Sequence, residues 1–264
     1  MRHSLAFPLL LILWAGWLLL MVSFSFQKLP IWIALDSISR PGLNLELEAS
    51  VPVRDKSLIR IATTTPGITP PAAIPVKGGR FKTQIPLPAN NAQIHGLHLW
   101  SALPAGNKMP QAISNGTIAI LDPDVLWIIL DIDDLIADRP WTHLESNDPP
   151  LPKLEAITGM LELSRDAVLV CSSKIPESRL PQLRRWWDFH SLPISVLFAE
   201  TDLQSLSHEL SSRLGNPAFC LSNSSPLKME LTPDIGVYQI GHPTGLDWLG
   251  ARTLLSSMLL QKEG

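Results

Sequence analysis

The stretch Val125-Leu-Trp-Ile-Ile-Leu-Asp-Ile-Asp-Asp-Leu-Ile136 limits the possible folds more than any other part of the chain. Six apolar residues run without interruption into Asp131, Asp133 and Asp134. A short run that is apolar on both faces is typical of a strand inside a parallel sheet. Such sheets bind ligands beyond the carboxyl ends of their strands. The stretch therefore predicts an α/β sheet with Asp131 and Asp133 at its ligand-binding edge.

Two carboxylates at this spacing suit two kinds of chemistry. Asp131 and Asp133 can hold a hard cation such as Mg²⁺ through oxygen. One of them can instead attack a phosphoryl group while the other transfers protons. The alternative without chemistry is an Asp-rich turn, in which Asp133 or Asp134 caps the segment that follows.

The chain after this stretch alternates between strand and helix patterns. Buried apolar runs predict strands, and apolar residues at helical spacing predict the helices between them. This alternation predicts a doubly wound parallel sheet. The expected strands cover 125–130, 167–173, 194–198, 218–221 and 236–240, and the expected helices cover 153–164, 180–190, 203–214 and 246–261.

The chain before this stretch has the pattern of half-buried strands. Between Leu43 and Val51, leucine and alanine alternate with asparagine and glutamate, which predicts an antiparallel strand. Four further strands are expected at 58–63, 80–87, 93–101 and 116–121. Together they predict a small antiparallel β-sandwich over residues 29–122, followed by an α/β domain over 123–264.

The N-terminus carries no charge from Leu5 to Phe26. A helix needs roughly 20 such residues to cross a bilayer. Residues 1–28 are therefore expected to be a transmembrane anchor, with a cleaved signal segment as the alternative, for which Ser23 and Ser25 form a poor cleavage site. Arg2 favours a cytoplasmic N-terminus. We expect a single-pass protein of a bacterial-type inner membrane with periplasmic C-terminal domains, or secretion after cleavage.

Net charge and cysteine positions bear on nucleic-acid binding and on disulfide formation. The net charge of −3 provides no basic field for nucleic acid. Cys171 and Cys220 each lie in an apolar run, which is typical of free core thiols, although an oxidising compartment leaves pairing open. The sequence contains no nucleophile elbow, zinc-protease motif, phosphate-binding loop or dinucleotide fingerprint.

The apolar strand followed by Asp-Ile-Asp-Asp resembles motif I of the haloacid dehalogenase (HAD) superfamily, in the form of the phosphatidate phosphatase branch of the actin-patch-protein type. This resemblance implies a HAD-like fold in which Asp131 forms an aspartyl-phosphate and Asp133 is the acid and base. The segment around Ser172 resembles motif II, whose hydroxyl binds the transferred phosphoryl oxygen. A helix cap or a serine turn is the alternative for Ser172. Leu135 replaces the threonine of motif I.

The later HAD motifs depart from the family pattern. Where motif III has a lysine, this chain has His208, with Lys174 and Lys228 as substitutes. In one alignment Asn223 replaces the motif IV aspartate; in another His242 does, with Asp247 further on. The preferred alignment gives catalytic residues Asp131, Asp133, Ser172 and His208, and a Mg²⁺ site of Asp131, Asp133 and Asn223. Loss of a carboxylate weakens the hold on this dication.

These motifs lead to two expected functions. The first is a membrane-anchored, Mg²⁺-dependent phosphatase acting on a phosphomonoester, such as a phosphorylated small molecule or a phosphatidate-type lipid. The second is a catalytically inactive HAD-like scaffold or binding protein at the membrane. The membrane would be contacted through the N-terminal helix, and no nucleic-acid partner is expected.

Overall fold

The structure is a computed structural model. It describes residues 31–53, 57–89, 92–106, 110, 112–133, 135–146, 148–223, 235–240 and 245–263. The expected anchor at 1–28 lies outside these residues, as do Asp134, Lys228 and His242. Within the described ranges, no helix has both the length and the apolar character needed to span a bilayer.

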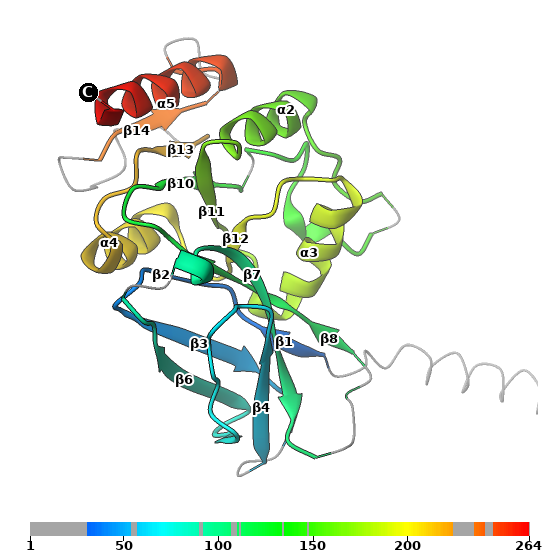
Figure 1. The fold of residues 1–264 in the computed structure, drawn as a ribbon. Coiled ribbons are helices and arrows are strands. Elements are labelled where there is room, and N and C mark those ends of the chain that lie inside the picture. Colours follow the sequence, from blue (N-terminus) through cyan, green and yellow to red (C-terminus); the bar gives the residue numbers. More distant parts are fainter. Residues whose placement is uncertain are drawn as a thin grey trace, which may run out of the picture.

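The chain forms a mixed α/β structure with three separate sheets (Figure 1). Two of the sheets belong to the N-terminal half, in the orders β6-β3-β1-β8 and β2-β9-β7-β4-β5, and the third has the order β12-β11-β10-β13-β14. The strands of the N-terminal half are β1 (Trp32–Ala34), β2 (Ser37–Ser39), β3 (Asn44–Ser50), β4 (Leu58–Thr63), β5 (Ile74–Pro75), β6 (Arg80–Pro86), β7 (Gly96–Pro104), β8 (Ile113–Ser114) and β9 (Gly116–Ile120).

The two N-terminal sheets pack face to face around one apolar core. Leu45 and Leu47 of β3 lie in it with Ile59 of β4 and Trp100 of β7. The expected alternation in β3 is confirmed, because its leucines are buried and Glu46 and Glu48 are only partly covered. The expected strand at 93–101 starts later, at Gly96, because a 3₁₀ helix occupies Ala92–Ile94.

The sandwich is not purely antiparallel, which corrects the sequence prediction. β1 pairs with β8 and β2 pairs with β9 in parallel. The reason is that segments 32–39 and 113–120 run side by side, and each segment contributes one short strand to each of the two sheets. Strands β1 and β2 have only three residues each, which is too short for an alternating pattern to be recognised in the sequence.

The third sheet is parallel throughout, with β10 in its centre. Across the sheet the strands stand in the order β12-β11-β10-β13-β14. The chain first adds strands on one side of β10 and then on the other, so the strand order reverses beside β10. Its elements are β10 (Leu126–Asp131), α2 (Leu154–Leu163), β11 (Ala167–Ser172), α3 (Leu180–Phe189), β12 (Val196–Phe198), α4 (Leu203–Leu214), β13 (Cys220–Ser222), β14 (Val237–Gln239) and α5 (Trp248–Glu263).

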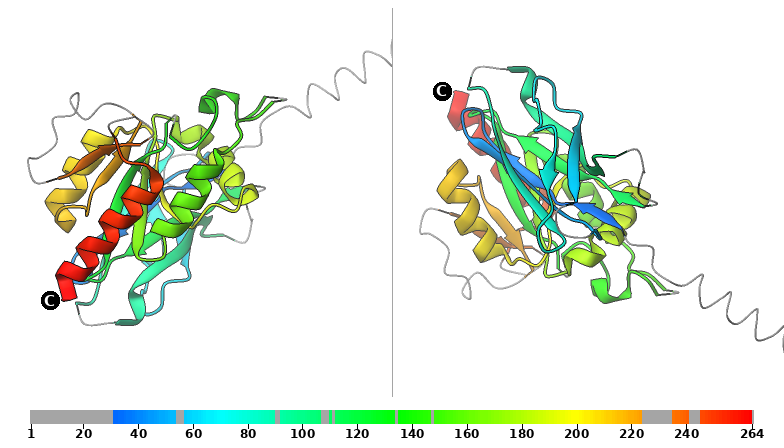
Figure 2. Two further views of the ribbon diagram at one scale, coloured as in Figure 1. Left: turned by 90° about the horizontal axis from the view of Figure 1, so that it is seen from above. Right: turned by 90° about the horizontal axis from the view of Figure 1, so that it is seen from below.

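Helices cover both faces of this sheet, as a doubly wound arrangement requires. Leucines of α4 pack on the face that carries Trp127 and Ile129. Helices α2, α3 and α5 pack on the face that carries Ile128 and Leu130. Figure 2 shows α5 lying beside α2, in agreement with the contacts between them.

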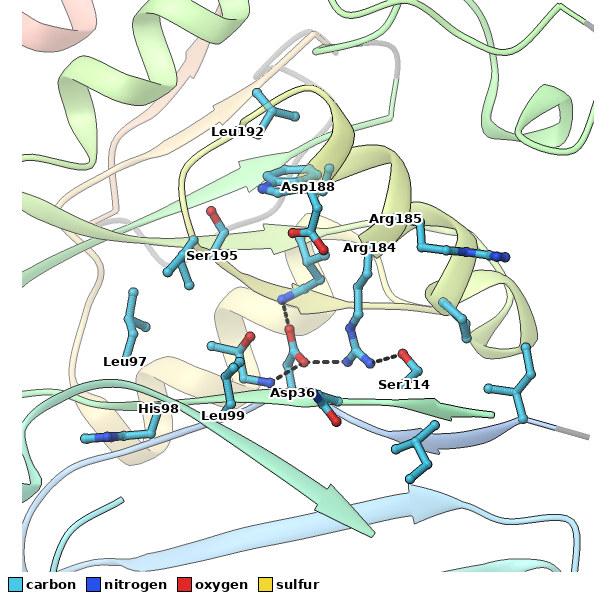
Figure 3. Close-up of a pocket in the computed structure, with 18 of the residues that line it drawn as sticks. Asp36, Leu97, His98, Leu99, Ser114, Arg184, Arg185, Asp188, Leu192 and Ser195 are labelled. Carbon is cyan, nitrogen blue, oxygen red and sulfur yellow. Dashed lines mark hydrogen bonds and ion pairs between the residues drawn. The ribbon is translucent and has the colours of Figure 1, made fainter. Parts of the chain in front are cut away.

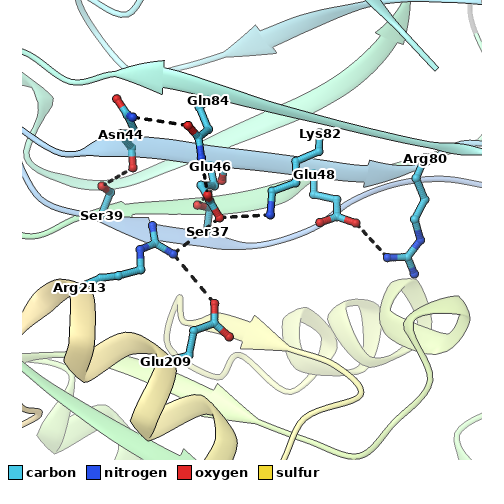
Figure 4. Close-up of polar contacts among 10 residues, drawn as sticks. All are labelled: Ser37, Ser39, Asn44, Glu46, Glu48, Arg80, Lys82, Gln84, Glu209 and Arg213. Atoms are coloured by element: carbon cyan, nitrogen blue, oxygen red, sulfur yellow. Dashed lines mark hydrogen bonds and ion pairs between the residues drawn. The ribbon is translucent and has the colours of Figure 1, made fainter. Parts of the chain in front are cut away.

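The sandwich completes the cover on the α4 face. Ile38 and Ala119, from β2 and β9, share an apolar cluster with Ile129 of the parallel sheet. Charged side chains border this contact: Arg213 of α4 reaches Glu46 of β3 at 3.8 Å (Figure 4). The chain passes from sandwich to parallel sheet between Ile120 and Leu126, and the division into independent domains at residue 122 stays a prediction.

The two cysteines are free and buried, as expected for core thiols. Cys171 lies on β11 opposite Leu130, and Cys220 lies on β13 opposite Ile129. The central strand β10 therefore separates them by two strand spacings, roughly 9–10 Å. A disulfide needs Cα atoms within about 7 Å, so this placement is incompatible with pairing.

Candidate active site

Asp131 ends the central strand, and the end of β11 lies beside it. Asp131 is in register with Ser172, which confirms the expected neighbourhood of the two strand ends. On its other side, the Ser222 hydroxyl at the end of β13 donates to Asp131 Oδ2 at 3.0 Å. The Asp133 amide donates to Asp131 Oδ1 at 3.3 Å. Three adjacent strands thus bring oxygen groups to one point of the sheet edge.

The pKa of Asp131 is raised, and burial is the largest cause. The neighbouring Asp133 carboxylate raises it further, whereas the Ser222 hydroxyl, the Asp133 amide and the Lys174 cation lower it. Each oxygen of Asp131 accepts one hydrogen bond, which leaves about two of the roughly four lone-pair positions of a carboxylate. Asp131 can therefore still receive a ligand.

Asp133 is bound more tightly than Asp131. Its Oδ1 accepts hydrogen bonds from the Ser173 hydroxyl at 2.6 Å and from the Trp141 indole at 3.0 Å. Its Oδ2 accepts from the Lys174 amide at 2.9 Å. Asp133 therefore ties the loop after β10 to the loop after β11 and to the 3₁₀ helix at Trp141–His143.

The remaining predicted site residues take different positions. The Ser172 hydroxyl is fully buried and makes a long contact of 3.4 Å with the Leu130 carbonyl. His208 is exposed on α4, and no contact within the described part of the chain joins it to Asp131 or Asp133. Asn223 follows Ser222 directly; its carbonyl accepts from Gln239, and the residue is exposed. Asp247 caps α5 through the Gly250 amide.

Sequence reasoning missed Ser173, Ser222 and Trp141. Ser222 follows the apolar run 218–221, and a hydroxyl at the end of a parallel strand is the only signal that the sequence offered for it. The contacts of Ser173 and Trp141 depend on loop geometry, which no pattern of spacing encodes. Lys174 was considered only as a substitute, yet its charge acts on Asp131.

A cavity of about 410 Å³ opens next to Asp133. Two cations, Lys174 and Arg179, line it together with Trp141 and Ile175. Apolar walls and a few polar groups are typical of a small-molecule site. The cavity suits an anion that also carries an apolar portion.

Few side chains at this edge of the sheet could coordinate a metal ion. Within the part of the chain that the structure describes, no group of three or more His, Cys, Asp or Glu side chains is placed to hold an ion. The Asp133 side chain is engaged by three donors, whereas Asp131 has free lone pairs. Mg²⁺ is often held by one or two carboxylates together with water and substrate phosphate. Asp131 keeps lone pairs for an ion, and Asn223 directly follows Ser222 at the end of the adjacent strand β13.

No protein-family model matches the chain, and no curated protein matches it either. Among solved structures, a carbohydrate acetylesterase from Xanthomonas citri is similar with a TM-score of 0.31 and 10% identity, over 89% of this chain and 66% of that chain. A cell-surface chitinase from a Paenibacillus strain has a TM-score of 0.21 and 12% identity, over 74% of this chain and 24% of that chain. The chain thus spans less than two thirds of either protein, and scores this low assign no fold or function.

Proposed function

We propose that the protein is a HAD-like phosphatase that hydrolyses a phosphomonoester through an aspartyl-phosphate on Asp131. The observation that carries the proposal is the position of Asp131 at the carboxyl end of the central strand, between the ends of β11 and β13. This is where a doubly wound sheet binds its ligand. The HAD-like assignment also rests on the motif resemblance around Asp131 and Ser172.

In the proposed first step, an Asp131 carboxylate oxygen attacks phosphorus. The bond from phosphorus to the leaving oxygen breaks, and protonated Asp133 gives its proton to that oxygen. In the second step, Asp133 takes a proton from a water molecule that attacks the phosphoryl group. The bond to Asp131 then breaks, which releases inorganic phosphate and restores the carboxylate. Ser222 orients Asp131 throughout, and the Lys174 charge offsets the negative charge of the phosphoryl group.

Mg²⁺ belongs to this proposal as a weakly held cofactor. Asp131 and the Asn223 side-chain oxygen would hold it, and it would neutralise charge on the phosphoryl oxygens. The substrate would be a phosphorylated small molecule or lipid whose apolar part occupies the cavity between Trp141 and Ile175. We further propose that residues 1–28 anchor the protein in a bacterial-type inner membrane with its folded part in the periplasm.

A second candidate is a HAD-like binding protein or scaffold without turnover. The observation that favours it is the environment of Asp133, whose carboxylate already accepts three hydrogen bonds. Those contacts give Asp133 a structural role. The two candidates differ in one respect that can be measured, namely whether phosphate is released.

The test is phosphate release by the full-length protein in detergent micelles, with p-nitrophenyl phosphate and phosphatidate as substrates and Mg²⁺ as the variable. We expect turnover at high Mg²⁺ concentration and its complete loss in Asp131→Asn, because an amide cannot form the acyl-phosphate. Asn223→Asp is expected to lower the Mg²⁺ requirement several-fold, because it adds a charged ligand.

The matched control is Asp148→Asn, which changes an exposed carboxylate in the loop before α2 and is expected to keep full turnover. Hydrolysis that survives Asp131→Asn would assign the activity to another site. Absence of turnover in both wild type and Asn223→Asp would reject the phosphatase and support the scaffold.

A further inference from the structure

A second cavity, of about 500 Å³, lies between helix α3 and strand β7 of the sandwich (Figure 3). Its lining contains neither Asp131 and Asp133 nor the serines around them. The size falls within the range of small-molecule sites, roughly 300–1,000 Å³. This cavity is therefore separate from the sheet edge that carries Asp131 and is large enough for a small ligand.

The buried charged groups of this cavity are already paired. Asp36 accepts from the amides of Thr117 and Leu197 and forms an ion pair with Arg184. Arg184 also donates to the Ser114 hydroxyl at 2.8 Å (Figure 3). A ligand would gain little by competing for these groups. The rest of the lining combines apolar side chains with the exposed charges of Arg185 and Asp188.

Apolar side chains surround the opening and are exposed to solvent. Leu97 and Leu99 are two residues apart on β7, so they point to the same side of the strand. Leu99 is 49% exposed, and Ile194, before β12, is 65% exposed. Both line the cavity. Together these exposed side chains offer an apolar surface on which a hydrocarbon chain can pack.

The cavity lies close to the predicted membrane anchor. Ile31, the first described residue, lines it. The uncharged segment ends at Phe26, five positions before Ile31, and five Cα-to-Cα steps span at most roughly 18 Å. The headgroup layer of a bilayer is roughly 5–8 Å thick on each side. The opening can therefore lie at the membrane surface.

We propose that this cavity takes an acyl chain of a membrane phospholipid. Arg185 lies on the rim, and it forms no ion pair with any residue that the structure describes. Its guanidinium cation would attract the phosphate group of the same lipid at the membrane surface. The proposal requires the anchor to be membrane-inserted, and it does not depend on chemistry at Asp131.

The test uses the full-length protein reconstituted into vesicles that contain phosphatidylcholine with a photoreactive diazirine in its acyl chain. After illumination, peptide mass spectrometry locates the attached lipid. We expect labelling around Leu97–Leu99 and Leu192–Ile194, in addition to labelling of the segment 5–26. Labelling of 5–26 without the cavity residues would overturn the proposal, as would the absence of labelling at both places.

A double variant, Leu99→Glu with Ile194→Glu, places charge across the opening. Since charge in a hydrocarbon environment is costly, cavity labelling is expected to fall by about tenfold or more, while labelling of 5–26 stays unchanged. Leu249→Glu on α5, also an exposed leucine at 73%, is the matched control and should leave both unchanged. Equal cavity labelling in the double variant and the control would contradict the proposal.

Discussion

Asp133 is the residue at which the two candidate functions separate. Its carboxylate joins three segments through Ser173, Trp141 and the Lys174 amide. If that is a structural role, Asp133→Asn should lower the free energy of unfolding by about 1–3 kcal/mol, because an amide offers one acceptor oxygen and leaves a buried donor poorly paired.

Urea denaturation of the full-length protein measures this change. Asp188→Asn, at an exposed position of α3, is the control and should alter the free energy of unfolding by less than about 0.5 kcal/mol. An Asp133→Asn variant as stable as the control would show that the three hydrogen bonds add nothing to the fold, and would leave acid–base chemistry as the role of Asp133.

The sequence predicted the residues of this site in part. Asp131 and Ser172 could be placed side by side, because each ends a buried run and neighbouring parallel strands end at one edge. Ser222 and Trp141 could not be assigned, because their contacts depend on strand register and on the path of a loop. The structure does not bring His208 to this site. Helix α4 buries its leucines, and His208 lies on its solvent-exposed side.

At the scale of elements, the strength of the pattern decided how well each one was predicted. Helix α4 was expected at 203–214 and lies at Leu203–Leu214. Its leucines repeat at helical spacing, which fixes the buried face. Strands β1 and β2 were missed because each has only three residues. Because the two strands were not predicted, their parallel pairing with β8 and β9 could not be predicted either.

Contact between α2 and α5 depends on one glycine. A Cβ atom at Gly159 of α2 would overlap the Trp248 ring at the start of α5. Gly159→Ala improves helix propensity by roughly 1 kcal/mol, yet overpacking at such a site costs about 1–3 kcal/mol. We therefore expect a net loss of stability.

Thermal unfolding followed by circular dichroism measures this loss. Thr158→Ala, one residue earlier on the exposed side of α2, also improves helix propensity and should raise the midpoint slightly. A midpoint for Gly159→Ala above that of wild type would mean that α5 can move away from α2 without loss.

At the scale of the whole molecule, one buried ion pair joins the sandwich to the α/β part. Asp36 lies between β1 and β2, where segment 32–39 crosses from one sheet to the other, and its side chain is 1% exposed. Arg184 of α3 is 14% exposed and also donates to the Ala34 carbonyl. The pair therefore fixes the crossing segment against α3.

Arg184→Gln would leave Asp36 buried without its cation. Removing one partner of a buried pair typically costs about 3–5 kcal/mol. The control is Arg165→Gln, which breaks an exposed pair with Glu162 and should cost at most about 1 kcal/mol. Urea denaturation compares the two variants, and equal losses would mean that the Asp36–Arg184 pair does not hold the two halves together.

The aspartyl-phosphate on Asp131 is the central claim, and trapping it is the most direct test. The full-length protein is mixed with substrate and Mg²⁺, quenched in acid and reduced with borohydride, which converts an acyl-phosphate to an alcohol. Peptide mass spectrometry is then expected to find homoserine in place of Asp131. Continued phosphate release with an unmodified Asp131, or homoserine at another aspartate, would contradict the account.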